Sequence, residues 1–219
     1  MKAVFWLVLI SLLLSGMAAV AVAQSGEVTH NTWTTGTAMP TARMGAAAGA
    51  VGANIYVIDG YNISSILGVN EIYNTKKNTW TTGVSDPNPR AWPAYAMVNK
   101  MLYVFGGSNG SILDIAESYN PATDTWTTLA PMPYIQQTAV AVADKDVIYV
   151  IGGQNPSGPI ASVASYNITA DTWTEEAPLL GPTAWNAAGL LGTTIVSADG
   201  FGGGMYEQIV YDNVQIYQP

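Results

Sequence analysis

Residues 94–128 read AYAMVNKMLYVFGGSNGSILDIAESYNPATDTWTT, and this stretch decides the fold. An apolar run ends in the pair Gly106-Gly107, Tyr119 follows 12 residues later, and Trp126 lies seven residues beyond the tyrosine. Between these landmarks, short segments rich in β-branched and aromatic residues are separated by Gly, Asn, Asp and Pro. The expected strands are 94–99, 101–105, 115–119 and 125–128. The stretch therefore predicts four short antiparallel strands joined by tight turns.

The same landmarks recur along the chain with a period of about 47 residues. The tryptophans, in the phrases NTWTT, NTWTT, DTWTT and DTWTE, are Trp33, Trp80, Trp126 and Trp173, at spacings of 47, 46 and 47. The tyrosines seven residues before a tryptophan are Tyr73, Tyr119 and Tyr166. The glycines that end the apolar runs are Gly60, Gly107, Gly153 and, after a weaker run, Gly200. Independent landmarks at one period indicate four copies of one structural unit.

Radial repetition of a four-stranded antiparallel unit is typical of a β-propeller. The glycine pair, the tyrosine and the tryptophan at these spacings resemble the kelch family, over residues 28–219. The resemblance implies an all-β, kelch-type β-propeller with four blades of four antiparallel strands. Two copies depart from the pattern, because Asp59-Gly60 and Asp199-Gly200 replace the glycine pair. The second glycine is retained, which indicates that this position needs a positive φ or a close backbone approach.

The two ends of the chain look complementary. Residues 28–35 have the pattern of an outermost strand, whereas 213–219 have that of a third strand without a fourth. We expect the N-terminal strand to complete the last blade and close the ring, which removes an unpaired edge. An open ring completed by a second chain is the alternative, and a monomer is favoured over a dimer. Taking Tyr217 as the last repeat tyrosine implies about four inserted residues in the preceding loop, and Tyr211 is the competing choice.

The first 23 residues predict a secretory signal peptide. Lys2 is followed by an apolar run over 3–20 and by Ala21-Val22-Ala23, a small-x-small cleavage pattern. An uncleaved membrane anchor is the alternative, since the run approaches spanning length. The expected mature domain is 24–219, secreted or periplasmic, with no membrane contact after cleavage.

Composition excludes several functions. The formal net charge is −8, which disfavours nucleic acid as a partner because its binding needs clustered Lys and Arg. The chain has no cysteine and one histidine, so disulfides, thiolate chemistry, Ser-His-Asp triads and zinc sites are not expected. The copper-radical sugar oxidases among kelch relatives are excluded on the same ground. We expect no cofactor and no metal.

Function is expected where the blades differ, on loops. The kelch resemblance implies that two loop sets share one face: the link that enters each blade, and the loop after the glycine pair. The link loops supply Arg43, Arg90 and Gln136 at one equivalent position, and Trp92 and Trp185 at another. The loops after the glycines supply Asn62, Asn109, Asn155 and, in the enlarged last loop, Glu207. Arginine suits carboxylates and tryptophan suits sugar faces. Structural roles for the arginines and turn roles for the asparagines are the simpler alternatives.

Three functions remain open, of which one is a purely structural scaffold in a larger exported assembly. The favoured one is a secreted binding module that presents this loop face to a protein or a carbohydrate, without catalysis. The alternative is a sugar-acid mutarotase or epimerase similar to periplasmic kelch enzymes that act on a sialic acid, motivated by Arg43 and Arg90. We identify no catalytic residue. A pocket in which both arginines converge beside an unpaired carboxylate would favour the enzyme; pairing of both with blade carboxylates would remove its basis.

Overall fold

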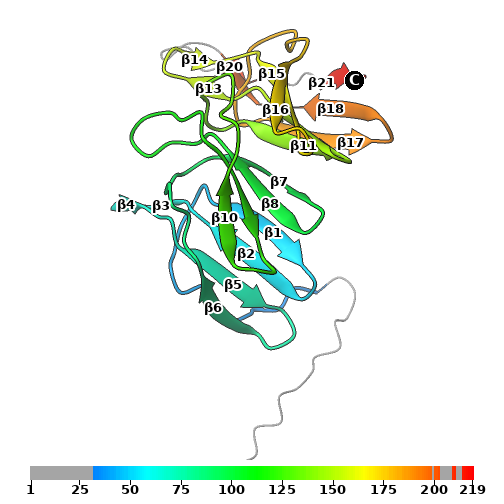
Figure 1. Cartoon of the computed structure of the whole chain (residues 1–219). Coiled ribbons are helices and arrows are strands. Elements are labelled where there is room, and N and C mark those ends of the chain that lie inside the picture. The colour runs from blue at the N-terminus through cyan, green and yellow to red at the C-terminus, as the bar shows by residue number, and fades with distance from the viewer. Residues whose placement is uncertain (1–31, 199, 203–208, 211–213) are drawn as a thin grey trace, which may run out of the picture. The chain divides into compact units, whose positions relative to one another are not determined.

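The computed structural model describes residues 32–198, 200–202, 209–210 and 214–219. The chain divides into two units, 1–35 and 36–219. Residues 32–35 of the first unit belong to no strand or helix. The second unit is built of small antiparallel sheets (Figure 1).

Three sheets contain four strands each. Blade 1 consists of β1 (Ala47–Val51), β2 (Asn54–Ile58), β5 (Asn70–Asn74) and β6 (Thr79–Gly83). Blade 2 consists of β7 (Ala94–Val98), β8 (Met101–Phe105), β9 (Ala116–Asn120) and β10 (Thr125–Thr128). Blade 3 consists of β11 (Val140–Asp144), β12 (Val147–Ile151), β15 (Val163–Asn167) and β16 (Thr172–Glu175). Blade 4 has three described strands: β17 (Ala187–Leu191), β18 (Thr194–Ala198) and β21 (Val214–Tyr217).

Small hairpins follow the glycine of three blades. They are β3 (Tyr61–Asn62) with β4 (Ser65–Ile66), β13 (Gln154–Asn155) with β14 (Gly158–Pro159), and β19 (Phe201–Gly202) with β20 (Ile209–Val210). In blade 2 a single bridge between Ser108 and Ile112 takes their place. These hairpins are the irregular parts of an otherwise regular repeat.

The strands expected from the sequence are confirmed. The four strands of blade 2 lie within one residue of their predicted bounds, and the described residues contain no helix, hence none that could span a membrane. Tyr217 pairs with Ile195 as Tyr166 pairs with Ile148, so Tyr217 is the repeat tyrosine of blade 4. The all-β propeller architecture is therefore correct.

The core lies between successive blades. Ala47, Tyr56 and Ile58 of blade 1 pack on Leu102, Val104 and Tyr119 of blade 2. The same arrangement joins blades 2 and 3 through Tyr103, Phe105, Ile148 and Tyr166, and blades 3 and 4 through Tyr149, Ile151 and Ile195. Blades 2 and 3 thus each use one apolar face toward the blade before and the other toward the blade after, as expected for a repeat fold.

The repeat tyrosine and tryptophan are structural. Their rings lie 5.0 Å apart in blade 1, 5.3 Å in blade 2 and 5.1 Å in blade 3. Each indole N–H donates to a backbone oxygen of the link that enters its blade; the acceptors are Thr37, Val84 and Ala130. Recurrence of these aromatics is therefore explained by packing, and not by a ring of ligand contacts.

Ring closure remains a prediction. Residues 28–31 and the predicted signal peptide, 1–23, lie outside the described residues, and β21 is the outermost described strand of blade 4. The inner strands β1, β7, β11 and β17 pack on one another in chain order. Among the described residues, β17 does not pack on β1 in the way that successive inner strands do.

Candidate functional site

The two loop sets lie at the same end of the blades, as the kelch resemblance implied. An antiparallel bridge joins the link entering each blade to the loop after its glycine. The bridged pairs are Met44 with Tyr61, Ala91 with Ser108, Gln137 with Gln154, and Ala184 with Phe201. Residues far apart in each repeat therefore form one surface.

Four residues with left-handed backbone connect the blades at this surface. They are Gly45 (φ 65°), Trp92 (φ 55°), Thr138 (φ 59°) and Trp185 (φ 60°). The N–H of Trp92 donates to the oxygen of Gly45 at 2.7 Å, that of Thr138 to Trp92 at 2.9 Å, and that of Trp185 to Thr138 at 3.0 Å. A left-handed conformation is costly for tryptophan and threonine, so the blade-to-blade hydrogen bonds hold it in place.

A pocket of about 430 Å³ opens beside these four residues. Its polar and aromatic lining comes from Trp92, Tyr95, Thr138, Trp185 and Asn186, and small residues of the inner strands complete it. Trp185 is 57% exposed and Tyr95 is also exposed, so two aromatic rings are available to a ligand. None of the described residues that line the pocket is charged.

The structure corrects the expectation that Arg43 and Arg90 face a ligand. Both guanidinium groups are buried. Arg43 donates to Glu71 at 2.7 Å and to the backbone oxygens of Asp59 and Val69 at 2.9 and 2.8 Å. Because the donors are directed to protein groups, Arg43 serves to connect the link of blade 1 to strands β2 and β5 of that blade.

Arg90 is the centre of a buried ion-pair cluster. Its Nη2 lies 3.0 Å from Asp86 and also contacts Glu117, and its Nε lies 3.8 Å from Asp59 of the preceding blade. The backbone oxygen of Ile115 accepts a further bond at 3.2 Å. Both arginines thus pair with blade carboxylates, which removes the observation that motivated the mutarotase hypothesis.

The Arg90 guanidinium is the one positive charge beside three carboxyl groups. A negative charge on Asp59 would therefore be poorly neutralised. Neither of its carboxylate oxygens accepts a hydrogen bond in the described structure, and the side chain is fully buried. Burial, together with the neighbouring Asp86 carboxylate, raises the pKa of Asp59 to about 9, while Arg90 opposes the shift. Asp59 therefore holds a proton in the folded state at neutral pH.

Replacing Asp59 by asparagine is expected to stabilise the fold at pH 7 and to flatten its pH dependence. The unfolded carboxyl, with a pKa near 3.8, releases a proton that the folded state retains up to about pH 9. Stability is therefore lost as pH rises across this window, by at most about 1.4 kcal/mol per pH unit. Urea unfolding of wild type and Asp59→Asn at pH 5, 7 and 8.5 measures this. Asp114→Asn, at an exposed carboxyl, should keep the wild-type slope; equal slopes for all three proteins would contradict the assignment.

The other predicted site residues divide into three groups. Gln136 is buried and accepts a hydrogen bond from Ser162 at 3.2 Å, so it has a structural role. Asn62, Asn109 and Asn155 each accept a backbone N–H two or three residues ahead, which is ordinary turn chemistry. Glu207 lies outside the described residues. Of the predicted residues, Trp92 and Trp185 are the two that the structure brings together at the pocket.

Sequence analysis missed Tyr95 and Tyr61. Tyr95 points out of the inner strand β7, between two buried alanines, and lines the pocket. The ring of Tyr61 lies beside that of Trp92, tilted by 38°, with centroids 6.0 Å apart. The signal for Tyr95 was available, because it is the one aromatic in the segment AYAMV, whose alternating alanines mark the packed face.

A model of the kelch motif matches residues 42–87, 89–133 and 138–180, which is more than half of the chain. The protein belongs to the kelch family. The fourth copy, after residue 180, lies beyond these matches. Its strand pairing, which repeats that of the other blades, supports it. No curated protein matches the chain.

Among solved structures, the kelch chain is similar to the one titled "Structure of YjhT". The two are 21% identical, with a TM-score of 0.71. The match covers 78% of this chain and 63% of that one, so the kelch chain spans less than two thirds of its length. At this identity the similarity concerns the fold. In the described part of the kelch chain, acidic side chains and histidine form no cluster suited to a metal ion.

Proposed function

We propose that this kelch protein is a binding module whose pocket beside Trp92 and Trp185 takes a neutral carbohydrate. The observation that carries the proposal is the combination of exposed aromatic rings with an uncharged lining. Aromatic faces stack on the C–H faces of sugar rings, whereas a charged sugar needs a cation that the described lining lacks. The hydroxyl of Thr138 and the amide of Asn186 supply polar contacts.

The pocket is suited to recognition of a preformed ligand. Its four left-handed residues are held by backbone hydrogen bonds between consecutive blades, so the position of Trp185 relative to Trp92 is set by the backbone. A rigid site loses little conformational entropy on binding. The hypothesis of a sugar-acid mutarotase is not carried forward, since Arg43 and Arg90 are buried in ion pairs.

Replacing Trp185 by alanine is expected to weaken binding of a neutral sugar about tenfold or more, which corresponds to about 1.4 kcal/mol. Isothermal titration calorimetry against neutral hexose oligosaccharides, N-acetylhexosamine oligosaccharides and a free sialic acid measures it. Ile63→Ala, which removes an 89% exposed apolar side chain on the β3–β4 hairpin, is the control and should bind as wild type.

Binding of a neutral oligosaccharide that is lost in Trp185→Ala and kept in Ile63→Ala supports the proposal. Binding of the sialic acid alone, or no binding of any of these sugars up to 10 mM ligand, on the order of the weakest specific affinities, would overturn it and leave a protein ligand as the function to test.

A further inference from the structure

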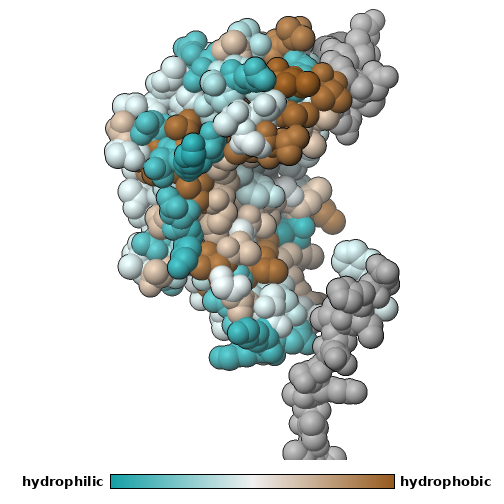
Figure 2. Space-filling view, turned by 90° about the vertical axis from the view of Figure 1, so that its right-hand side faces the viewer, coloured by the Kyte–Doolittle hydropathy of each residue, from teal (hydrophilic) through white to brown (hydrophobic). Residues whose placement is uncertain are grey.

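Blade 4 exposes the apolar face that each other blade packs against its successor. Cross-strand pairing puts Leu191, Val196 and Ile216 on one face of this sheet, opposite the face that contacts blade 3. Leu191 is 77% exposed and Ile216 is 69% exposed. Figure 2 looks onto the side where β17, β18 and β21 lie in Figure 1, and hydrophobic surface gathers in its upper part. Exposed apolar surface of this kind marks an interaction site.

Blade 1 exposes the complementary face. Ile55 and Tyr73 form a cross-strand pair, as Leu102 and Tyr119 do in blade 2. In blade 2 this pair is buried against blade 1, whereas Ile55 is exposed. The face of blade 1 that corresponds to a contact with a preceding blade is therefore open at Ile55.

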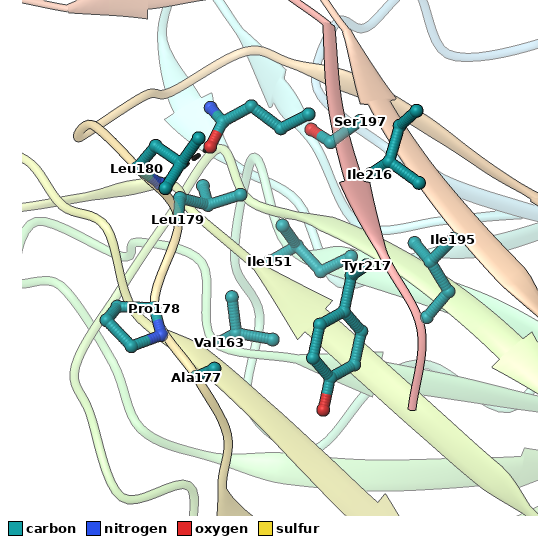
Figure 3. A pocket seen from close by; sticks show the side chains of 11 residues that line it. Ile151, Val163, Ala177, Pro178, Leu179, Leu180, Ile195, Ser197, Ile216 and Tyr217 are labelled. Carbon is teal, nitrogen blue, oxygen red and sulfur yellow. Dashed lines mark hydrogen bonds between the residues drawn. The ribbon is translucent and has the colours of Figure 1, made fainter.

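A second feature of blade 4 is an unfilled position for a tryptophan. Tyr217 packs on no tryptophan among the described residues, unlike the other three repeat tyrosines. Beside it lies a pocket of about 230 Å³ (Figure 3). It is lined by Ala177, Pro178, Leu179, Ile216 and Tyr217, among others, and Ala177 stands four residues after Trp173, as Ala130 stands four after Trp126. We name this pocket the tryptophan socket.

The segment before blade 1 carries the matching tryptophan. Trp33 stands four residues before Thr37, whose backbone N–H donates to Asn78 Oδ1 at 2.7 Å. Val84 and Ala130 are bound in the same way by Asp124 and Asp171 after the outermost strands of blades 1 and 2. Residues 32–35 therefore have the sequence position of an outermost strand. The blade that such a strand would complete is one that precedes blade 1.

The approach of an aspartate to an arginine across two blades points to the same junction. Asp59 of blade 1 faces Arg90, which enters blade 2, across their interface. Blades 2 and 3 have a Gly-Gly pair in place of Asp-Gly. The links that follow them have the uncharged Gln136 and Thr183 at the position of Arg90. Blade 4 again has aspartate, Asp199, and the repeat position that would face it is Arg43 of a blade 1. The acid in blade 4 and the arginine of blade 1 thus follow the pattern of a real interface.

The occupant that fits this face is a second copy of the chain. Among the described residues, no strand of blade 1 packs on a strand of blade 4 as the strands of successive blades do. The four residues from Trp33 to Thr37 span at most about 14 Å, so the segment 32–35 reaches only a blade packed directly on its own blade 1. A second copy whose blade 1 packs on blade 4 meets this condition.

We propose that blade 4 of one copy packs on blade 1 of a second copy, whose residues 32–35 add to the free edge of β21 with Trp33 in the tryptophan socket. Strand addition supplies backbone hydrogen bonds and the socket supplies specificity. Two identical contacts related by a two-fold axis close the assembly as a dimer of eight blades.

Light scattering coupled to size-exclusion chromatography, on protein expressed from the full sequence, tests this at concentrations around tens of micromolar, where a specific interface of standard size is populated. Wild type is expected at the mass of two chains. Leu191→Asp and Ile55→Asp, one on each face, are expected at the mass of one chain, and Ile63→Asp at the mass of two. Trp33→Ala is expected to weaken the dimer at least tenfold.

Mixing the two face variants separates the proposal from simple misfolding. Blade 4 of Ile55→Asp and blade 1 of Leu191→Asp are both intact, so an equimolar mixture should form a mixed dimer through one wild-type contact. A monomeric wild type would overturn the proposal in favour of closure by the chain's own N-terminal strand. Association of Leu191→Asp alone at the wild-type level would overturn it as well.

Discussion

Replacing Arg90 by methionine is expected to lower the free energy of unfolding by about 3–5 kcal/mol, the usual effect of removing one partner of a buried ion pair. The guanidinium is the one cation among Asp59, Asp86 and Glu117, all of which are buried. Without it Asp86 and Glu117 lose their compensating charge and must bind protons to stay buried. Urea unfolding at pH 7, followed by tryptophan fluorescence, measures the loss.

Two further variants make the result interpretable. Lys76→Met removes an exposed cation and should change stability by less than about 0.5 kcal/mol. Arg90→Gln combined with Asp86→Met and Glu117→Ala copies the neutral set Gln136, Met132 and Ala164 of blade 3 and should regain more than half of the loss. A loss below 1 kcal/mol in Arg90→Met, on the order of an exposed pair, would show that the cluster contributes little.

Gly106→Ala is expected to destabilise the protein by about 3 kcal/mol or more. Gly106 has φ 61°, and a Cβ at this residue would collide with the backbone oxygen of Gln136 in the link to blade 3. That oxygen also accepts the N–H of Gly107 at 2.9 Å, so moving it breaks a hydrogen bond between blades. The left-handed backbone accounts for about 1 kcal/mol, and the collision with a fixed backbone atom for the rest.

The control is Gly52→Ala in the β1–β2 turn. Gly52 has the same φ, 61°, and nothing lies within 4 Å of the Cβ position. It should therefore cost only the backbone term, about 1 kcal/mol. Thermal and urea unfolding of both variants measure the difference, and equal losses would show that the contact with Gln136 is unimportant.

The regular part of this fold could be predicted because each landmark has a local cause. β-branched residues, turn residues and the Tyr–Trp spacing each repeat four times or nearly so, and their agreement removes the ambiguity of any single copy. The repetition left Tyr217 and Tyr211 as competing choices, and the pairing of Tyr217 with Ile195 decided for Tyr217. The repetition also predicted that the second glycine of the pair is kept for its backbone conformation. Its φ is 105° at Gly60 and 119° at Gly200, values that suit glycine alone.

The roles of the arginines could have been inferred from the chain itself. Arg43 and Arg90 occur in blades with a glutamate two residues before the repeat tyrosine, Glu71 and Glu117. Blade 3 has Gln136 and, in place of the glutamate, an alanine. This pairing within the repeat indicates a contact inside the blade. A search for ligand residues at single positions does not detect it.

By itself the sequence determined the repeat, the strands, the family and the aromatic packing, because these depend on spacing along the chain and on local conformational preference. The tertiary structure decided which side chains face solvent: it buried Arg43 and Arg90, left Trp185 and Tyr95 beside a pocket, and exposed the outer faces of blades 1 and 4. Those outcomes depend on how one blade packs on the next. That packing is set by contacts between residues about 47 positions apart, and no local preference encodes it.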